Sequence, residues 1–140
     1  MPQKIFVNLP VADLDRSRAF YSALGFGIDD AFSDETAACV VISDTIFLMI
    51  LTHPRFQGFS PLPRADTQAT TAVLLALSRD SRDAVDDMMA AALAAGGAEP
   101  HPVEDHGWMY GRTFTDPDGN VFEPFWMDVE AANAAQKMGG

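Results

Sequence analysis

Glu123 is the residue of this sequence best suited to chemistry, because it is the only carboxylate in an apolar run at residues 121–127. If the run is a strand, Phe125 shares the face of Glu123, whereas Trp126 points the other way and is expected in the core. A carboxylate on a cavity wall can bind a hard divalent cation. Without a cation, burial among apolar side chains favours the protonated carboxyl, which makes Glu123 a candidate general base.

The preceding run at residues 109–115 adds two polar side chains. Tyr110 and Arg112 fall on one face of a strand, and both are expected to line the pocket that contains Glu123. Arg112 is also predicted to pair with Glu123 across adjacent strands. Such a pair either neutralises a half-buried carboxylate or belongs to a functional site, and the structural interpretation is favoured.

The histidines and the cysteine are weaker candidates. His101 and His106 are five residues apart, so on a strand they face opposite sides and cannot chelate one metal ion. His106 is the better candidate for the rim of a pocket. Cys39 has no neighbouring base and is expected to be a buried, unreactive thiol. A single cysteine excludes an internal disulfide and fits a cytoplasmic location.

Composition narrows the class of protein further. The chain has 140 residues and 48% hydrophobic residues, which favours one domain with one core. Its formal net charge of −11 opposes binding to nucleic acid or to an anionic membrane. The first residues lack the pattern of a signal peptide, and the longest apolar runs are too short to span a bilayer.

The pattern of elements repeats once along the chain. Each half begins with a short strand and continues with a helix that starts at a capping residue, Asp13 or Ser81, and ends at a glycine. The second helix is expected to direct Val85, Met88, Met89, Ala92 and Leu93 inward. Three extended runs finish each half, at about 98–104, 109–115 and 121–127 in the second. This order predicts two βαβββ modules in a single domain spanning residues 1–140. The predicted parts are module one at about 1–52, a connecting loop at about 53–70, module two at about 71–128 and a short helix at about 129–137.

Two stretches resemble signatures of a known superfamily. The first combines Val11 and Asp13 with Ser17, Phe20-Tyr21 and Leu24-Gly25-Phe26. The second runs from Phe114 through Asp116-Pro117-Asp118-Gly119-Asn120 to Glu123. Together they resemble the glyoxalase, bleomycin resistance and extradiol dioxygenase superfamily, also called vicinal oxygen chelate proteins. The resemblance implies an α+β fold in which two βαβββ modules form a curled mixed sheet around a central cavity, usually in a homodimer.

The resemblance also implies four metal-ligand positions, and only one of them holds a ligand. Metal-dependent members place His, Glu or Gln where this sequence has Phe6, Met49 and Leu74, and only Glu123 is retained. One carboxylate does not hold a catalytic metal ion. An alignment shifted by one or two residues offers four substitutes, of which His53 alone is a strong donor: Asn8, Thr52, His53 and Thr71.

Three functions follow from these observations. The preferred one is a metal-free protein that binds a small organic molecule in a largely apolar cavity, with no cofactor. The second is a metal-dependent lyase or isomerase, similar to lactoylglutathione lyase, or a dioxygenase with atypical ligands to a divalent metal. The third is an interaction domain that acts through a dimer surface. The residues expected to line the pocket beside Glu123 are Phe6, Asn8, Met49, Leu74, His106, Tyr110, Arg112 and Phe125.

Overall fold

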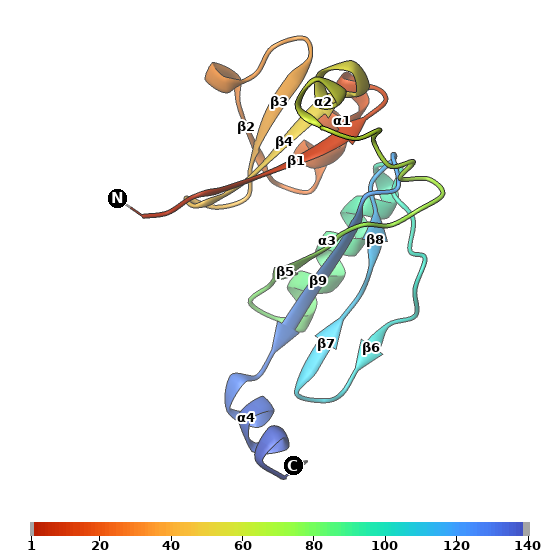
Figure 1. Cartoon of the computed structure of the whole chain (residues 1–140). Coiled ribbons are helices and arrows are strands. Elements are labelled where there is room, and N and C mark those ends of the chain that lie inside the picture. Colours follow the sequence, from red (N-terminus) through yellow and green to blue (C-terminus); the bar gives the residue numbers. More distant parts are fainter. Residues whose placement is uncertain (1, 139–140) are drawn as a thin grey trace.

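The computed structural model describes residues 2–138 and arranges them as two modules (Figure 1). Each module begins with a strand and a helix and continues with further strands, as the repeat predicts. The first module consists of β1 (Ile5–Val11), α1 (Leu14–Ala23), β2 (Gly27–Asp29), a 3-10 turn (Asp30–Phe32), β3 (Ala37–Val41) and β4 (Ile46–Thr52), and α2 (His53–Phe59) follows it. The second consists of β5 (Leu74–Ser78), α3 (Arg82–Ala94), β6 (Glu104–Asp105), β7 (Met109–Gly111), β8 (Phe114–Thr115) and β9 (Val121–Met127), and α4 (Val129–Met138) follows it.

The first sheet has the strand order β1-β4-β3-β2, and α1 covers one of its faces. Alternate residues of β1, Leu9 and Val11 among them, point toward α1 and are buried. Asp13 caps α1 by accepting a hydrogen bond from a backbone N–H of the first turn. Gly25 follows the helix with a φ of 94°, a conformation that glycine adopts without strain.

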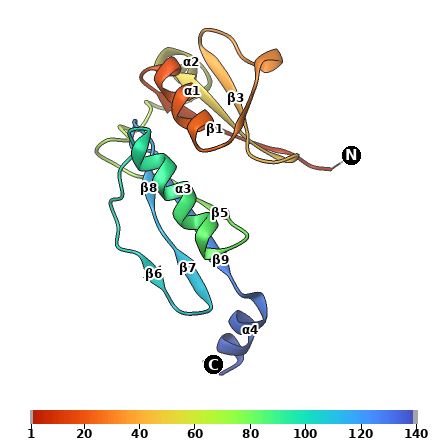
Figure 2. The same cartoon turned by 180° about the vertical axis from the view of Figure 1, so that it is seen from behind.

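The second sheet has the order β5-β9-β7-β6, with β8 also paired to β9. β5 runs parallel to β9, just as β1 runs parallel to β4 in the first module. α3 lies along one face of this sheet (Figure 2), and Ser81 caps it by accepting a hydrogen bond from the Ala84 N–H. Its inward residues are Val85, Met88, Met89 and Ala92, whereas Leu93, also expected inward, is 42% exposed.

The core passes from one module to the other through aromatic side chains. Phe20 and Tyr21 of α1 meet Phe114 and Phe122 of the second sheet, all four being buried. The Phe114 and Phe122 rings stack with centroids 5.2 Å apart, and the Tyr21 ring lies 5.8 Å from that of Phe122. The two modules therefore share one hydrophobic core.

Several predicted elements differ in detail. The expected loop at 53–70 begins with α2, whose first turn contains Pro54, a residue that fits there because the first helical N–H groups need no partner. The expected strand at 98–104 is reduced to a bridge at Ala98 and to β6, because Pro100 and Pro102 lack the N–H of a strand. The run at 109–115 divides into β7 and β8. None of the helices within residues 2–138 is long and apolar enough to cross a membrane.

The α+β class and the two-module architecture are confirmed, but the two sheets do not close into one curled sheet. Within residues 2–138, no strand of one sheet pairs with a strand of the other. In Figure 1, the first sheet lies across one end of the second module, and the two sheets do not face each other. Each sheet therefore keeps one face that its own helix does not cover, and the expected central cavity is not enclosed by a single chain.

Candidate functional site

The uncovered face of the first sheet, here called the first open face, presents alternate residues of β1 and β4. Phe6 stacks on Phe47 with ring centroids 4.7 Å apart, and 48% of its surface is exposed. Asn8 lies beside Met49, and Met49 lies beside Cys39 on β3. Cys39 is buried as expected, and burial raises the pKa of its thiol. The first open face is therefore mainly aromatic and aliphatic, with the Asn8 amide as a polar group.

Helix α2 bounds one end of this face. Together, Asn8, Leu51, Phe56, Phe59 and Ser60 line an open hollow of about 560 Å³. Asn8 and Phe56 also line a smaller hollow of about 130 Å³, whose other walls come from Leu9, Pro10 and residues of the segments 65–73 and 119–121. Asn8 thus contributes to both hollows, which extend from the first open face to the junction of the modules.

The uncovered face of the second sheet, here called the second open face, contains Glu123. Its neighbours include Leu74, which is 59% exposed, and Ala76, which pairs with Glu123 in the sheet. Glu123 lines two hollows, one of about 190 Å³ and one of about 380 Å³, and Glu104 lines both as well. Gly111 lies between Glu104 and Phe125 in the sheet, and its missing side chain leaves room for the smaller hollow.

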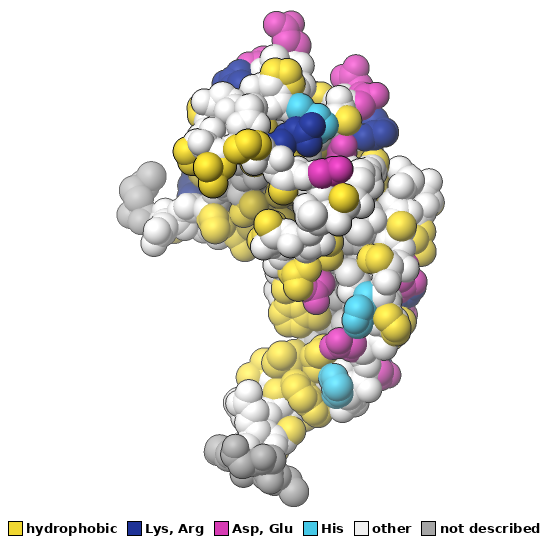
Figure 3. All heavy atoms as spheres, turned by 45° about the vertical axis from the view of Figure 1, so that its right-hand side comes forward, with side chains coloured by type: hydrophobic (Ala, Val, Ile, Leu, Met, Phe, Trp, Pro, Cys, Tyr) yellow, Lys and Arg dark blue, Asp and Glu magenta, His cyan; other side chains and the backbone are white. Residues whose placement is uncertain are grey.

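Hydrophobic side chains gather where the first module overhangs the second and again toward the end of the second module (Figure 3). Large apolar side chains with 38% or more of their surface exposed include Phe6 on the first open face and Leu74 and Met127 on the second, whereas Ile5 and Ile46 alternate to the other side of the first sheet. Contiguous exposed apolar surface on a folded domain commonly marks a binding surface. Both open faces have this character.

The residues expected to surround Glu123 are divided between the two sheets. Phe6, Asn8 and Met49 lie on the first open face. Leu74 and Phe125 lie on the second open face with Glu123. The chain therefore separates the positions that the superfamily resemblance groups in one cavity.

Arg112 does not pair with Glu123, and this prediction is wrong. Strand alternation directs the Arg112 guanidinium to the side of α3, where its Nη1 donates to Asp86 Oδ1 at 2.9 Å. Its Nε and Nη2 donate to the two oxygens of Glu99, each at 2.9 Å. These partners come from α3 and from the segment after it, and the strand pattern alone does not predict that they lie near Arg112. The Arg112 guanidinium is thus engaged away from the carboxylate of Glu123, although Arg112 is among the residues that line the hollow of about 190 Å³ beside Glu123, as expected.

Tyr110 belongs to the same cluster on the α3 side. Its hydroxyl donates to Asp86 Oδ1 at 2.6 Å. This bond, together with Arg112, lowers the pKa of Asp86, and the bonds from Arg112 lower the pKa of Glu99. Tyr110 and Arg112 therefore hold α3 and its following segment against the sheet, and their polar groups point away from the second open face.

His106 lies at the exposed end of the β6–β7 hairpin. Its ring stacks on that of Trp108 with centroids 5.9 Å apart, and its Nε2 lies 4.0 Å from a Glu104 oxygen. His101, by contrast, lines one of the hollows that contain Glu123. The structure thus places His101, which the sequence disfavoured, closer to the carboxylate site than the sequence predicts.

The donor set does not fit a metal ion. Of the four implied ligand positions, Phe6 and Leu74 have no donor atom, and Met49 offers only a thioether. Within residues 2–138, no group of three His, Cys, Asp or Glu side chains is arranged to hold an ion. His53 begins α2 and does not join Glu123 in such a group. A catalytic metal site normally requires three protein ligands.

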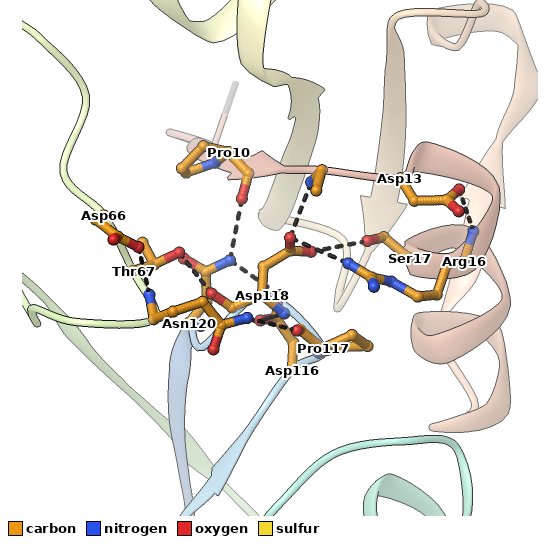
Figure 4. A network of polar contacts seen from close by, with 12 residues as sticks. Pro10, Asp13, Arg16, Ser17, Asp66, Thr67, Asp116, Pro117, Asp118 and Asn120 are labelled. Atoms are coloured by element: carbon orange, nitrogen blue, oxygen red, sulfur yellow. Dashed lines mark hydrogen bonds and ion pairs between the residues drawn. The ribbon is translucent and has the colours of Figure 1, made fainter.

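A polar network at the junction of the modules went unrecognised in the sequence. Asp118, in the turn before β9, accepts hydrogen bonds from the Ala12 N–H at 2.8 Å, from Arg16 Nη2 at 3.2 Å and from the Ser17 hydroxyl at 3.4 Å (Figure 4). Asn120 Nδ2 donates to the Pro10 carbonyl at 3.3 Å. These bonds fasten the second module to the end of β1 and the start of α1.

Asp116 anchors the same turn from inside. Its carboxylate accepts hydrogen bonds from the Tyr21 hydroxyl at 2.7 Å, from Asn120 Nδ2 at 2.9 Å and from the backbone N–H groups of Asp118 and Asn120. Burial raises the pKa of Asp116, although these bonds act in the opposite direction. The signal was present as the Asp-Pro-Asp-Gly-Asn motif, but its partners are about 100 residues away in sequence.

Part of the first module's sequence matches a family model described as "Bleomycin resistance protein-like N-terminal", over residues 3–43. No curated protein matches the sequence significantly. The match covers β1, α1, β2 and β3, and so includes the first of the two sequence signatures.

Solved structures match nearly the whole chain. A hypothetical protein, SA1046 from S. aureus, has a TM-score of 0.76 and 27% identity, with 90% of this chain and 94% of that chain covered. A glyoxalase/bleomycin resistance protein/dioxygenase family enzyme from Burkholderia phytofirmans has a TM-score of 0.74 and 20% identity, with 90% and 99% covered. A bleomycin resistance determinant encoded on the transposon Tn5 has a TM-score of 0.62 and 24% identity, with 91% and 99% covered. The chain therefore has the fold of the glyoxalase, bleomycin resistance and dioxygenase superfamily, which confirms the resemblance predicted from its two signatures.

Proposed function

We propose that this protein binds a small organic molecule without a metal ion, in cavities formed between the first open face of one copy and the second open face of another. The observation that carries the proposal is the exposure of large apolar side chains on both faces, with Phe6 at 48% and Leu74 at 59%. A single chain leaves these side chains in water, which is costly for contiguous apolar surface. Contact between two copies would cover both faces at once.

The junction of the modules supports pairing between copies over closure within one chain. The shared aromatic core and the bonds of Asp118 hold the sheets so that their open faces do not meet. Bringing Phe6 next to Glu123 inside one chain would require these contacts to break. A second copy supplies the missing wall without that cost.

The side chains on the two faces indicate the kind of ligand. Phe6, Phe47, Leu74 and Phe125 offer apolar contact area, and the polar groups among them are few. Ligand pockets typically combine such walls with a small number of polar groups that orient the ligand. Asn8 and Glu123 are the residues proposed for that role, and Glu123 is also the candidate general base if the site has catalytic activity.

The alternative function is a metal-dependent lyase, isomerase or dioxygenase, and Glu123 favours it as the retained ligand position. The alternative needs at least two further ligands, and Phe6, Met49 and Leu74 do not supply them. Metal analysis of the purified protein separates the two functions. We expect less than one equivalent of bound divalent metal, and a stoichiometric metal ion would overturn the metal-free proposal.

Ligand binding is tested by thermal shift against a library of small organic molecules, with divalent ions as a separate arm. A compound that binds the native state raises the unfolding temperature. Leu74→Ala should reduce this shift, whereas Leu93→Ala, which removes a comparably exposed leucine from α3, should leave it unchanged. Stabilisation by metal ions alone, or by no compound, would contradict the proposed function. Light scattering at several protein concentrations tests the pairing of copies.

A further inference from the structure

We infer that Lys4 of one copy forms an ion pair with the carboxylates of Glu123 and Glu104 on the second open face of another copy. The inference rests on the proposed pairing of the two open faces. It assigns the charged contact that sets the alignment of those faces, which their apolar side chains alone do not specify.

Lys4 lies at the edge of the first open face. It lies just before β1 and two residues before Phe6, so strand alternation places it on the same side as Phe6 and Asn8. Its Nζ lies 5.6 Å from the centroid of the Phe47 ring. Within residues 2–138, Lys4 forms no hydrogen bond or ion pair with a carboxylate. The Phe47 ring thus supports an ammonium group that remains available on an apolar surface.

Among residues 2–136, whose side chains the structure describes, the other lysine and arginine side chains do not compete for this role. Five arginines bond to carboxylates of their own chain, as Arg112 does with Glu99 and Asp86. Arg64 lies in the segment between the modules and donates to a backbone carbonyl. Arg79 directly follows β5, and strand alternation places it on the same side as Leu75 and Leu77, which face the core. Among the lysine and arginine side chains of residues 2–136, Lys4 is therefore the one that lies on an open face.

The second open face carries the complementary charge. Glu123 on β9 and Glu104 on β6 line the same two hollows, and within residues 2–136 neither carboxylate bonds to an arginine or lysine, although His106 Nε2 lies 4.0 Å from a Glu104 oxygen. Arg112, the nearest cation in the strand sequence, donates to Glu99 and Asp86 on the other side of the sheet. Two carboxylates beside apolar side chains lose hydration when a second copy covers them, and a cation placed there stabilises their charged form.

Charge complementarity is needed because the chain repels itself. The formal net charge of −11 opposes the approach of two identical copies. When unlike faces pair, the cation on one open face attracts the carboxylates on the other. The same charges oppose the pairing of two second open faces, which would bring Glu123 of each copy together. The charges therefore favour one of the available pairings.

Charge reversal in the full chain tests the inference. Lys4→Glu should raise the dimer dissociation constant by roughly tenfold or more, because like charges then face each other. Combining Lys4→Glu with Glu123→Lys, or with Glu104→Lys, should restore most of the wild-type affinity, and the better rescue identifies the principal partner. Far-UV circular dichroism and thermal unfolding establish that each variant is folded.

Arg18→Glu is the matched control, since it makes the same change of charge at an exposed ion pair on α1, away from the open faces. It should change the dissociation constant much less than Lys4→Glu does. A wild-type dimer that Lys4→Glu leaves unchanged, or that neither double variant rescues, would overturn the ion pair while the pairing of open faces stands. A wild-type protein that stays monomeric at all concentrations would overturn both.

Discussion

The two faces of each sheet differ in how completely their apolar side chains are buried and their polar groups are bonded within the chain. On the sides that α1 and α3 cover, apolar side chains are buried, and Asp116, Asp118 and Arg112 have hydrogen-bond partners within the chain. On the open faces, Phe6 and Leu74 are about half exposed, and Glu123 and Lys4 lack ionic partners within residues 2–136. The covered faces thus account for the folding of the chain, and the open faces are available for binding.

This difference separates two roles that share the same strands. In β9, Phe122 is buried against α1 and α3, whereas its neighbour Glu123 faces the hollows. A substitution at one position should mainly affect stability, and a substitution one residue away should mainly affect binding. The following experiments test how sharp that separation is.

The largest effect is expected for Phe122→Ala. The phenylalanine is fully buried and contacts the rings of Tyr21 and Phe114, so its removal leaves a cavity in the core shared by both modules. We expect a loss of about 3–5 kcal/mol in the free energy of unfolding. Urea denaturation measures it. A loss below about 1 kcal/mol would show that the covered faces are not the main source of stability.

A somewhat smaller effect is expected for Asp116→Ala. This change leaves the Tyr21 hydroxyl, the Asn120 amide and two backbone N–H groups without their acceptor. The expected loss is about 2–4 kcal/mol, since unsatisfied buried donors are costly. We also expect that the double variant, Asp116→Ala with Tyr21→Phe, loses less stability than the sum of the two single losses. Denaturant unfolding of all three variants measures this. Additive losses would mean that the two groups act independently.

Acid should weaken the cluster on the α3 side. The folded-state pKa values of Asp86 and Glu99 lie below their ordinary values of 3.8 and 4.5. Their contribution to stability is therefore present above those ordinary values and is lost as the pH falls through the lowered ones. Arg112→Met should reduce this loss when unfolding is measured between pH 6 and pH 2. An equally steep loss in the variant would place the acid sensitivity elsewhere.

The smallest effect on unfolding is expected for Phe6→Ala, measured at protein concentrations low enough to populate the monomer. The side chain is 48% exposed and rests mainly on Phe47, so the expected loss is about 1 kcal/mol or less. The same variant should weaken the proposed dimer, as light scattering over a dilution series would detect. A loss comparable to that of Phe122→Ala would remove the distinction between the two kinds of face.

Local patterns in the sequence predicted the repeated architecture well. Asp13 and Ser81 cap the two principal helices as expected, and Gly25 and Gly96 follow those helices with positive φ. Strand alternation also placed Trp126 on the face opposite Glu123 correctly, since Trp126 packs near Arg82 of α3. These features depend on residues close together in the chain, so the sequence contains the information needed to predict them.

Features that depend on distant partners were missed. The alternation of β7 and β9 does not reveal that Glu99 and Asp86, and not Glu123, accept the hydrogen bonds of Arg112. The residues after β4 contain Gly58, which disfavours a helix, yet α2 forms there over the end of the first open face. The separation of Phe6 from Glu123 follows from the angle between the sheets, which no local pattern encodes.

The hydrogen bonds of Asp118 to Ala12, Arg16 and Ser17 fix that angle, and the angle has a consequence for assembly. Unlike faces of two copies can meet twice only when a two-fold axis relates the copies, and any other rotation leaves one contact unmade, so that the assembly grows as a larger ring or an open chain. The rigid junction would allow two copies to satisfy both of their contacts with each other and stop. Loosening it, for example through Asp118→Ala, would free successive copies to join end to end as filaments.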